Sequence, residues 1–462
     1  MPRLFSDHLV LQAYKPIPIW GTANSNQKIT VTLANQSKVA EVGSDGKWTV
    51  TLDPLPSAEN LTLQVQGENS MTITDVMIGE VWVCSGQSNM ALPVSKAKDF
   101  DKEQPAANWP KIRMFTDKWI VCSPETVKDF SAVGYFFARE IHQKLGSPVG
   151  LIFRASGGTL IELWTDAKVQ KNAPELSPLF KTTSNSKLSP EDIAQAEVDR
   201  QQALEVEGKN AASATKKMSG YLFESRITPL IPFAIQGVLW YQGEANSYTS
   251  KAYLYGAQLS VMINDWRTRW GNNFWFISVQ LPELGKEQSA PVEESGRAWV
   301  REGVFQSLKL PHTGMAVTLG TGEAGNNHPK NKQDVGRRLA LWALSQIYNK
   351  TEEPASGPLF AEQKIEGKKM IVTFNYASGG LSSKGGELKG FAIAGKDGQW
   401  RWANATIEGN TVILSHPELN EPVAVRYAWA GNPNSSNLVN GAGLPASPFR
   451  TDNETTFSAV SP

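Results

Sequence analysis

The pattern of apolar and polar residues changes twice along the chain. Residues 1–76 contain short alternating runs, such as KITVTLANQ and KVAEVGSDGKWTVTLD, separated by Gly, Pro and Asp-Gly. Alternation with turn residues at intervals of roughly eight to twelve positions is typical of antiparallel strands. The same alternation returns near the C-terminus, in KIEGKKMIVTFNY and TVILSHPEL. We therefore predict an antiparallel β domain at each end of the chain, over residues 1–76 and 353–462.

Residues 77–352 between these ends alternate short apolar runs with longer amphipathic segments. The apolar runs predict strands at EVWVC, KIRMF, VGLIF, GVLWY, FWFISVQL and GMAVTL. The amphipathic segments predict helices over residues 130–145, 252–270, 297–309 and 331–348. Strands that alternate with helices imply a parallel sheet covered on both faces. The predicted fold class is thus α/β, with a central parallel sheet flanked by the two antiparallel β domains.

Several chemically useful residues directly follow the predicted strands. Ser88 and Gln242 each come just after an apolar run, the Gly157–Gly158 pair follows VGLIF, and His328 lies in the loop after GMAVTL. In a parallel sheet of this kind, the loops that leave the carboxyl ends of the strands form the site. We therefore expect these residues to meet at one edge of the central sheet.

A nucleophile and its base can be proposed from this placement. Ser88 follows Gly86 at the end of a buried strand, where a sharp turn would expose its hydroxyl. A serine nucleophile needs a base, and histidine is the usual one. Of the five histidines, only His328 falls on the carboxyl edge of the predicted sheet. The alternatives are that Ser88 is an ordinary turn serine and that His328 only caps the helix that follows it.

Three segments carry a resemblance to a known family: GEVWVCSGQSNMAL at 79–92, WYQGEAN at 240–246 and GEAGNNHPK at 322–330. They resemble the sialate O-acetylesterase family of carbohydrate esterases, a branch of the SGNH hydrolases, and the likeness covers nearly the whole chain. The resemblance implies an SGNH-type, flavodoxin-like central sheet. It also implies removal of O-acetyl groups from a sugar, foremost an O-acetylated sialic acid, through an acetyl-enzyme on Ser88 that water activated by His328 hydrolyses.

Two other functions stay open at this point. Related sequences share these segments while acting on plant or algal polysaccharides such as xylan or pectin, so an acetyl esterase of that kind is one alternative. A carbohydrate-binding protein on an inactive esterase fold is the other. In either case the expected partner is a carbohydrate, and the oligomeric state is left open.

The resemblance further implies how the rest of the site is built. The oxyanion hole would combine the backbone N–H of Ser88, a backbone N–H of Gly157 or Gly158, and the side-chain amide of Gln242. We expect four other residues to support the loops or contact substrate: Gln87, Asn89, Glu244 and Trp164. Gln87 and Asn89 would hold the turn by hydrogen bonds, as polar side chains commonly do there. Glu244 would bind substrate or brace its loop, and Trp164 would line the pocket or the core.

One departure from the family concerns the base. Family members usually carry an aspartate two or three residues before the histidine, and those positions are Asn326 and Gly325 here. The nearest acids are Glu323 and Asp334. An asparagine accepts a hydrogen bond from an imidazole but adds no charge to stabilise the imidazolium. The sequence leaves three possibilities: a Ser-His dyad, recruitment of Glu323, or a weakened or inactive site.

Composition limits the possible partners and cofactors. The chain has 45 Lys and Arg against 45 Asp and Glu, which gives no argument for nucleic acid or an anionic membrane. No metal-ligand spacing or phosphate-binding loop is present, so we expect neither a metal nor a cofactor. Cys84 and Cys122 lie in apolar runs and are expected to be free thiols.

A polar segment at about 166–217, with Ser189 and Pro190 as a helix start, predicts a helical excursion at the rim of the site. Because enzymes of the family commonly work outside the cytoplasm, we expect an extracellular or periplasmic location.

Overall fold

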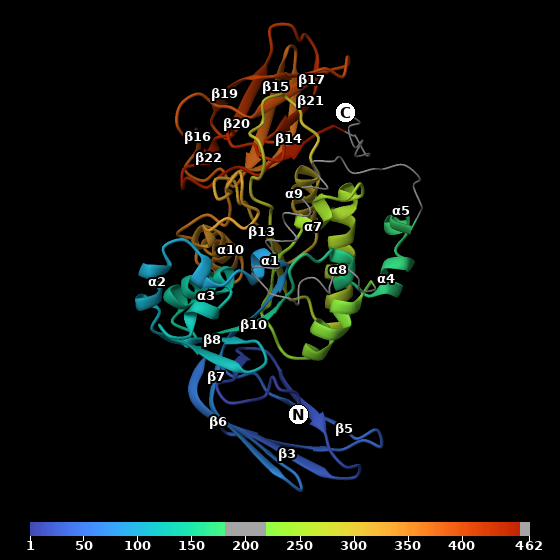
Figure 1. Ribbon diagram of the computed structural model, residues 1–462, viewed down its shortest axis with the longest axis vertical. Coiled ribbons are helices and arrows are strands. Elements are labelled where there is room, and N and C mark those ends of the chain that lie inside the picture. The colour runs from blue at the N-terminus through green and yellow to red at the C-terminus, as the bar shows by residue number, and fades with distance from the viewer. Residues whose placement is uncertain (181–218, 453–462) are drawn as a thin grey trace.

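The three predicted regions are arranged in a row in the structure, a computed structural model that describes residues 1–180 and 219–452 (Figure 1). The N-terminal β domain lies at one end, the α/β region in the middle and the C-terminal β domain at the other end. The predicted helix that starts near Ser189 lies outside the described residues. The described part of the predicted excursion contains α4 (Ala167–Asn172) and α5 (Ser177–Phe180).

The central sheet confirms the predicted α/β class. Its strands are β7 (Ser70–Gly86), β8 (Trp109–Phe115), β9 (Trp119–Cys122), β10 (Val149–Ala155), β11 (Gly237–Tyr241), β12 (Trp275–Val279) and β13 (Thr313–Ala316). They are ordered β13-β12-β11-β7-β10-β8-β9. Every neighbouring pair is parallel except β8 and β9. Each of the predicted strands is present, and β9 adds an antiparallel edge that the sequence pattern did not indicate.

Helices cover both faces of this sheet, as predicted. The long ones are α3 (Ala132–Leu145), α8 (Tyr255–Trp270), α9 (Gly296–Gln306) and α10 (Lys332–Gln346), and the short ones include α1 (Ser88–Ala91), α2 (Phe100–Ala106) and α7 (Glu244–Ser247). Helices α3 and α10 pack together on one side of the sheet, and α8 and α9 pack on the other (Figure 1). Gly336 allows the close approach of α10 to α3, because a Cβ there would lie 2.6 Å from Cβ of Phe136.

The N-terminal domain is continuous with the central sheet. Its strands are β1 (Val10–Gln12), β2 (Ile17–Thr22), β3 (Lys28–Leu33), β4 (Gln36–Glu41), β5 (Lys47–Leu52) and β6 (Ala58–Gln66). The first part of β7 pairs antiparallel with β6, and its last part pairs parallel with β10 and β11. The predicted border after residue 76 therefore lies inside one long strand. Burial along β7 changes there from mostly exposed to complete, which is why the sequence pattern changes without a break in the backbone ladder.

The C-terminal domain contains two four-stranded antiparallel sheets, ordered β14-β15-β20-β19 and β18-β17-β21-β23. Its strands are β14 (Leu359–Glu366), β15 (Lys369–Asn375), β16 (Leu381–Ser383), β17 (Phe391–Gly395), β18 (Trp400–Trp402), β19 (Asn404–Glu408), β20 (Thr411–Ser415), β21 (Pro422–Tyr427), β22 (Leu438–Asn440) and β23 (Phe449–Arg450). Arg450 forms an ion pair with Glu302 of α9, and Arg301 of the same helix donates to the carbonyl oxygens of Ala430 and Gly431. These contacts attach the C-terminal domain to the central one.

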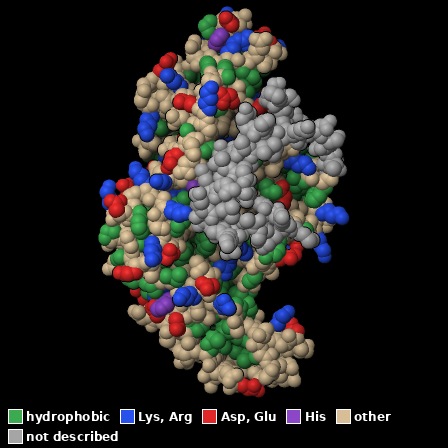
Figure 2. All heavy atoms as spheres, viewed as in Figure 1, with side chains coloured by type: hydrophobic (Ala, Val, Ile, Leu, Met, Phe, Trp, Pro, Cys, Tyr) green, Lys and Arg blue, Asp and Glu red, His purple; other side chains and the backbone are tan. Residues whose placement is uncertain are grey.

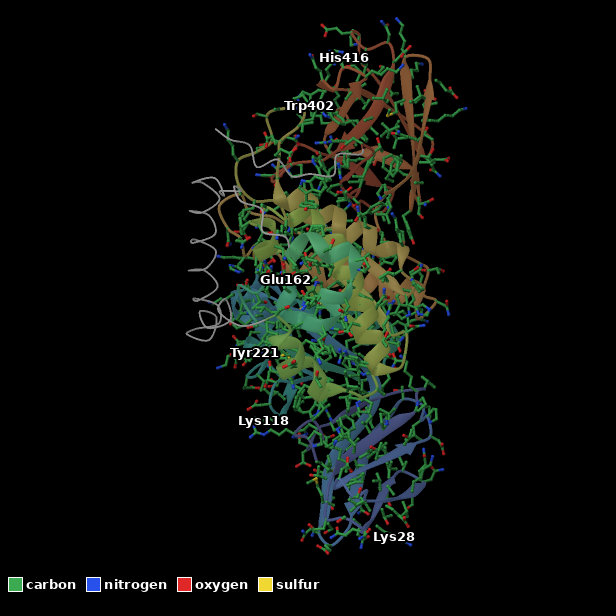
Figure 3. All side chains as sticks on the ribbon, turned by 90° about the vertical axis from the view of Figure 1, so that its right-hand side faces the viewer. Lys28, Lys118, Glu162, Tyr221, Trp402 and His416 are labelled. Carbon is green, nitrogen blue, oxygen red and sulfur yellow. The ribbon has the colours of Figure 1, made fainter. Side chains whose placement is uncertain are left out.

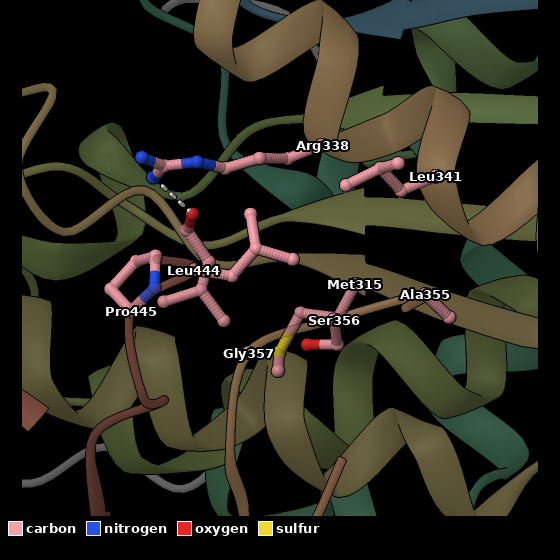
Figure 4. Close-up of a pocket in the computed structure, with 9 residues that line it drawn as sticks. Met315, Arg338, Leu341, Ala355, Ser356, Gly357, Leu444 and Pro445 are labelled. Carbon is pink, nitrogen blue, oxygen red and sulfur yellow. Dashed lines mark hydrogen bonds between the residues drawn. The ribbon is translucent and has the colours of Figure 1, made fainter. Parts of the chain in front are cut away.

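A small cavity lies at this junction. Met315 of β13, Arg338 of α10, Ser356 and Leu444 are among its lining residues (Figure 4). Its volume is about 10 Å³, which is room for no more than one water. Arg338 donates to the carbonyl oxygens of Val317 and Leu319 and so is already engaged. The junction is therefore a packing contact, and the candidate chemistry lies elsewhere.

Candidate active site

The turn that carries Ser88 is built by a glycine that no other residue could replace without strain. Strand β7 ends at Gly86, which has a φ of 128°, and a Cβ at this position would lie 2.1 Å from the carbonyl oxygen of Tyr241. Helix α1 begins at Ser88 only two residues later. The chain thus turns sharply between a buried strand and a helix and presents the Ser88 hydroxyl at the carboxyl edge of the sheet.

His328 contacts this hydroxyl directly. Its Nε2 lies 2.7 Å from Oγ of Ser88, and both residues are buried. This is the distance at which a general base takes the proton of a nucleophile. Helix α10 begins at Lys332, and its N-cap is Asn331, whose side chain accepts from the backbone N–H of Asp334. The alternative that His328 only caps helix α10 is therefore wrong, because Asn331 is the N-cap.

The other four histidines have local partners of their own. They are His8 with Asp75, His142 with the carbonyl oxygen of Ser147, His312 with that of Asn273, and His416 with the backbone N–H of Glu418. His416 lies at the outer end of the C-terminal domain, far from Glu162 in the central domain (Figure 3). Only His328 is placed to serve Ser88.

The surroundings of His328 favour its neutral form. Burial and, to a lesser extent, the positive charges of Lys332, Arg297 and Lys96 together lower the pKa of His328 to about 3. A neutral imidazole has a lone pair on Nε2 that can accept the serine proton. The ring is therefore ready to act as a base over a wide pH range, although the positive neighbours oppose the imidazolium that proton transfer creates.

Neither Asn326 nor Glu323 orients the ring of His328. The Oδ1 of Asn326 accepts from the backbone N–H of His328 at 2.9 Å, while its Nδ2 donates to Glu323 Oε2 at 2.9 Å and to the carbonyl oxygen of His328 at 3.0 Å. Glu323 Oε1 accepts from the backbone N–H of Lys330. Both side chains thus shape the loop backbone. Among residues 1–180 and 219–452, Ser88 is the only hydrogen-bond partner of the imidazole, so the geometry is that of a dyad.

The predicted oxyanion donors lie on adjacent strands. Ala155 pairs with Gly86, so the Gly157–Gly158 loop after β10 begins beside the turn of Ser88. Gly158 has a φ of 65°, and a Cβ built there would meet nothing within 4 Å. In the described part of the chain, no acceptor is bonded to the backbone N–H of Ser88, Gly157 or Gly158. These groups are therefore available to a developing oxyanion.

The amide of Gln242 is differently placed from the prediction. Its Nε2 donates to the carbonyl oxygen of Thr159 at 2.9 Å and to Oδ1 of Asn246 at 2.7 Å, with Oε1 of Gln87 at 3.2 Å. Its Oε1 accepts from the hydroxyl of Tyr255. Because an amide has only two N–H groups, both are occupied here. An oxyanion role for Gln242 stays a prediction that would require one of these contacts to be exchanged.

Gln87 and Asn89 join the loops of the neighbouring strands. Oε1 of Gln87 accepts from the backbone N–H groups of Gly243 and Ala245, at 3.3 Å each, at the start of α7. Nδ2 of Asn89 donates to Oε1 of Glu244 at 2.5 Å and to the carbonyl oxygen of Asn327 at 2.8 Å. Side chains on both sides of Ser88 therefore hold the loops that follow β11 and β13.

Glu244 and Trp164 are both internal. The Glu244 side chain is buried, and burial raises the pKa of its carboxyl group. The Trp164 ring is fully buried, its indole N–H donates to Oγ1 of Thr159 at 3.0 Å, and it packs edge-on against Trp240. Of the alternatives offered by the sequence, the structure supports loop bracing for Glu244 and core packing for Trp164.

The site also contains residues that the sequence analysis missed. Lys332 is wholly buried and donates to Oδ1 of Asn89, and Arg297 of α9 donates to Oδ1 of Asn327. In the sequence, both looked like ordinary polar positions of amphipathic helices. A lysine at the first position of a helix is a weak signal, because a cation there opposes the helix dipole.

Other kinds of site find no support in the residues described. No group of three or more side chains suited to a metal ion occurs among them. None of the helices in the described ranges is both long and apolar enough to cross a membrane. Cys84 and Cys122 are buried free thiols, as expected. Basic and acidic side chains are interspersed on the face shown in Figure 2, in agreement with the balanced composition.

Comparison with known proteins agrees with this geometry. Residues 78–183 and 215–345 match the family described as carbohydrate esterase, sialic acid-specific acetylesterase. The sialate O-acetylesterase of Mus musculus is 28% identical over 479 aligned residues, which cover 89% of this chain and 85% of that protein. The Homo sapiens sialate O-acetylesterase is 26% identical, with 89% and 83% covered.

A solved structure extends the match to the whole chain. The crystal structure of a carbohydrate acetylesterase from Xanthomonas citri superimposes with a TM-score of 0.85 at 32% identity. The match covers 98% of this chain and 99% of that one. The chain therefore belongs to the sialic acid-specific acetylesterase family of carbohydrate esterases, and it is a carbohydrate acetylesterase.

Proposed function

We propose that this acetylesterase works through a Ser88–His328 dyad and that its substrate is an O-acetylated sialic acid. The 2.7 Å contact between Nε2 of His328 and Oγ of Ser88 carries the proposal. Oγ attacks the acetyl carbonyl carbon while Nε2 takes the hydroxyl proton. The resulting oxyanion faces the backbone N–H groups of Ser88 and Gly158, each of which can contribute about 3 kcal/mol to transition-state stabilisation.

The reaction then proceeds in two stages. The imidazolium of His328 returns its proton to the sugar oxygen as the ester bond breaks, which leaves an acetyl group on Oγ of Ser88. Water takes the place of the sugar, gives a proton to His328 and attacks the acetyl carbon. Collapse of the second tetrahedral intermediate releases acetate and restores the serine hydroxyl. No charged acid takes part, so the imidazolium is stabilised chiefly by the adjacent oxyanion.

Two observations support a sialic acid rather than a neutral sugar. The family and the mammalian relatives carry that substrate in their names. In addition, Lys332, Arg297 and Lys96 each act on His328 as positive charges, so the potential at the site suits a carboxylate-bearing sugar. An acetylated pectin is also anionic and is the nearer of the two polysaccharide alternatives, whereas an acetylated xylan backbone offers no such charge.

The catalytic part is tested by acetate release from an aryl acetate. Wild type should turn over, while Ser88→Ala and His328→Ala should each lose about a thousandfold or more of kcat. A fluorophosphonate should label wild type at Ser88. If wild type neither turns over nor reacts, yet binds acetylated glycans, the inactive carbohydrate-binding alternative replaces this proposal.

The substrate is tested separately, with acetyl esters at matched concentration. We expect kcat/KM to be highest for O-acetylated sialic acid, and to fall as salt is raised, because screening weakens attraction of its carboxylate. A preference for acetylated xylan or pectin would keep the dyad and replace the sialic acid assignment.

A further inference from the structure

Lys332 occupies a position that local physical chemistry disfavours. It is the first residue of α10, where a positive charge opposes the helix dipole, and its side chain is wholly buried. Within the described ranges no carboxylate lies close enough to form an ion pair with it. Nζ donates to Oδ1 of Asn89 and lies 5.1 Å from the centre of the Tyr241 ring. A buried ammonium without an ionic partner is costly, and such costs are commonly retained for function.

The partner of Lys332 is the residue next to the nucleophile. With Oδ1 held by Lys332, the amide of Asn89 turns its two N–H groups toward Glu244 and the carbonyl oxygen of Asn327. Asn327 immediately precedes His328. The orientation of one amide thus fixes the turn of the nucleophile against the loop of the base, and the ammonium determines that orientation because it can only donate.

We propose that Lys332 is a positioning residue of the esterase, which acts through Asn89 to hold Ser88 and His328 in register. The proposal rests on the Ser88–His328 dyad proposed above. It assigns to Lys332 the task that a carboxylate beside the imidazole performs in a triad, namely fixing the geometry of the base, although Lys332 does so from the side of the nucleophile and without contacting the ring.

The charge of Lys332 adds a measurable signature to this role. The groups that face it are Glu244 of α7, Glu323 and His328 of the loop before α10, and the Tyr241 ring of β11, while α1 contributes the neutral Asn89. Burial lowers the pKa of Lys332 to about 7, so the ammonium is charged in acid, where it lowers the pKa of His328. Removal of this charge should therefore move the acid limb of the kcat/KM profile to higher pH.

The test replaces the lysine by a side chain of similar length, Lys332→Met, in the full chain. We expect kcat for an aryl acetate at pH 6, where Lys332 is charged, to fall about tenfold or more, with KM within about threefold. The acid limb should rise by about one pH unit, the order expected for a unit charge several ångströms away at an effective dielectric constant near 20. Lys118→Met, which changes an exposed lysine in the turn between β8 and β9, is the matched control and should change neither quantity.

The thermal stability of Lys332→Met distinguishes a positioning role of Lys332 from a role in packing alone. Replacement of a buried unpaired charge by an apolar side chain should leave Tm unchanged or raise it. A fall in Tm with unchanged kcat and an unmoved pH profile would overturn the proposal. If Lys332→Met does not fold, Lys332→Leu, which also lacks a donor, is measured in its place. A kcat and a pH profile equal to those of wild type would again overturn the proposal.

A double-mutant cycle tests the route through Asn89. If Lys332 acts through that amide, Asn89→Ala and the double variant with Lys332→Met should have the same kcat, because the second change removes nothing further. Independent losses that multiply would contradict the route. Ser88→Ala is measured in parallel: residual activity equal to wild type there would refute the dyad itself, whereas an inactive Ser88→Ala beside a fully active Lys332→Met would refute only the role of Lys332.

Discussion

The nucleophile turn, residues 86–89, and the histidine loop, residues 322–330, carry the two halves of the dyad but are held in different ways. The nucleophile turn is fixed by other strands: Gly86 fits against Tyr241, and Gln87 and Asn89 bind the loops after β11 and β13. The histidine loop is held by Asn326 and Glu323 within the loop and by Glu283, Arg297 and Asn89 from outside it. Its imidazole, in contrast, has Ser88 as its only hydrogen-bond partner among the described residues.

This difference shows which contacts fix the position of the nucleophile and which fix the position of the base. A turn held by several strands cannot move without disturbing the sheet, so the position of Ser88 is a property of the whole fold. The loop that carries the base is also anchored from several segments, but the imidazole itself is held by Ser88 alone among the described residues, without a carboxylate on its ring. We therefore expect substitutions in the nucleophile turn to be severe, and substitutions of Asn326 or Glu323, which do not contact the ring of the base, to be mild.

Gly86→Ala should have the largest effect. The new Cβ would lie 2.1 Å from the carbonyl oxygen of Tyr241 at a φ of 128°, so Ser88 must move. A misplacement of about 1 Å can cost about a hundredfold in rate, and we expect at least that loss in kcat. Gly146→Ala is the control, since it shares a positive φ of 71° at the end of α3 but meets nothing within 4 Å. Equal losses in both variants would show that strain in φ, and not the collision, is decisive.

Gln87→Ala should come next. It removes the acceptor shared by the amide of Gln242 and the backbone N–H groups of Gly243 and Ala245. Leaving buried donors unsatisfied costs about 1–3 kcal/mol, so urea unfolding should show a loss of that order, with kcat about tenfold lower. Gln64→Ala, at an exposed position of β6 in the N-terminal domain, should change neither value appreciably. Wild-type activity in Gln87→Ala would mean that the turn does not depend on this bridge.

The pH dependence tests the histidine loop. Because the pKa of His328 is lowered from 6.5 to about 3, the base stays neutral and kcat/KM should remain level down to about pH 4. Between these two values the unfolded chain binds a proton at this residue that the folded protein does not, so stability falls as pH falls through this window. Urea unfolding of wild type and His328→Gln at pH 7 and pH 4.5 should show a weaker pH dependence in the variant. An acid limb near 6.5 would contradict the lowered pKa.

Asn326→Asp should have the smallest effect. The new carboxylate would keep the contact with the backbone N–H of His328 but would lose both donated bonds and face Glu323. We expect kcat to fall a few-fold and not to rise, with some recovery when Glu323→Gln removes the repulsion. A tenfold gain in kcat would show that an acid at this position reaches the imidazole, and would place the loop closer to a triad than its hydrogen bonds indicate.

Much of this protein can be derived from local pattern. The strands and helices of the central domain follow from hydrophobic periodicity, and the carboxyl-edge rule brings Ser88 and His328 together before any coordinates are known. The border after residue 76 was harder to predict, since a strand that passes from a half-buried to a fully buried sheet changes pattern without ending. The sequence also placed Asn326 beside His328, but it did not show whether Asn326 would bind the imidazole or the backbone of that residue.

The sequence by itself therefore determined the fold class and predicted the proposed nucleophile and base, because both depend on residue type and order along each strand. Only the tertiary structure decided which acceptors occupy the amide of Gln242, that no acid of the described chain reaches the imidazole, and that Lys332 is buried behind Asn89. The physical reason is that a polar side chain has many possible partners of equal chemistry. Which one it binds is settled by distances between segments far apart in the chain.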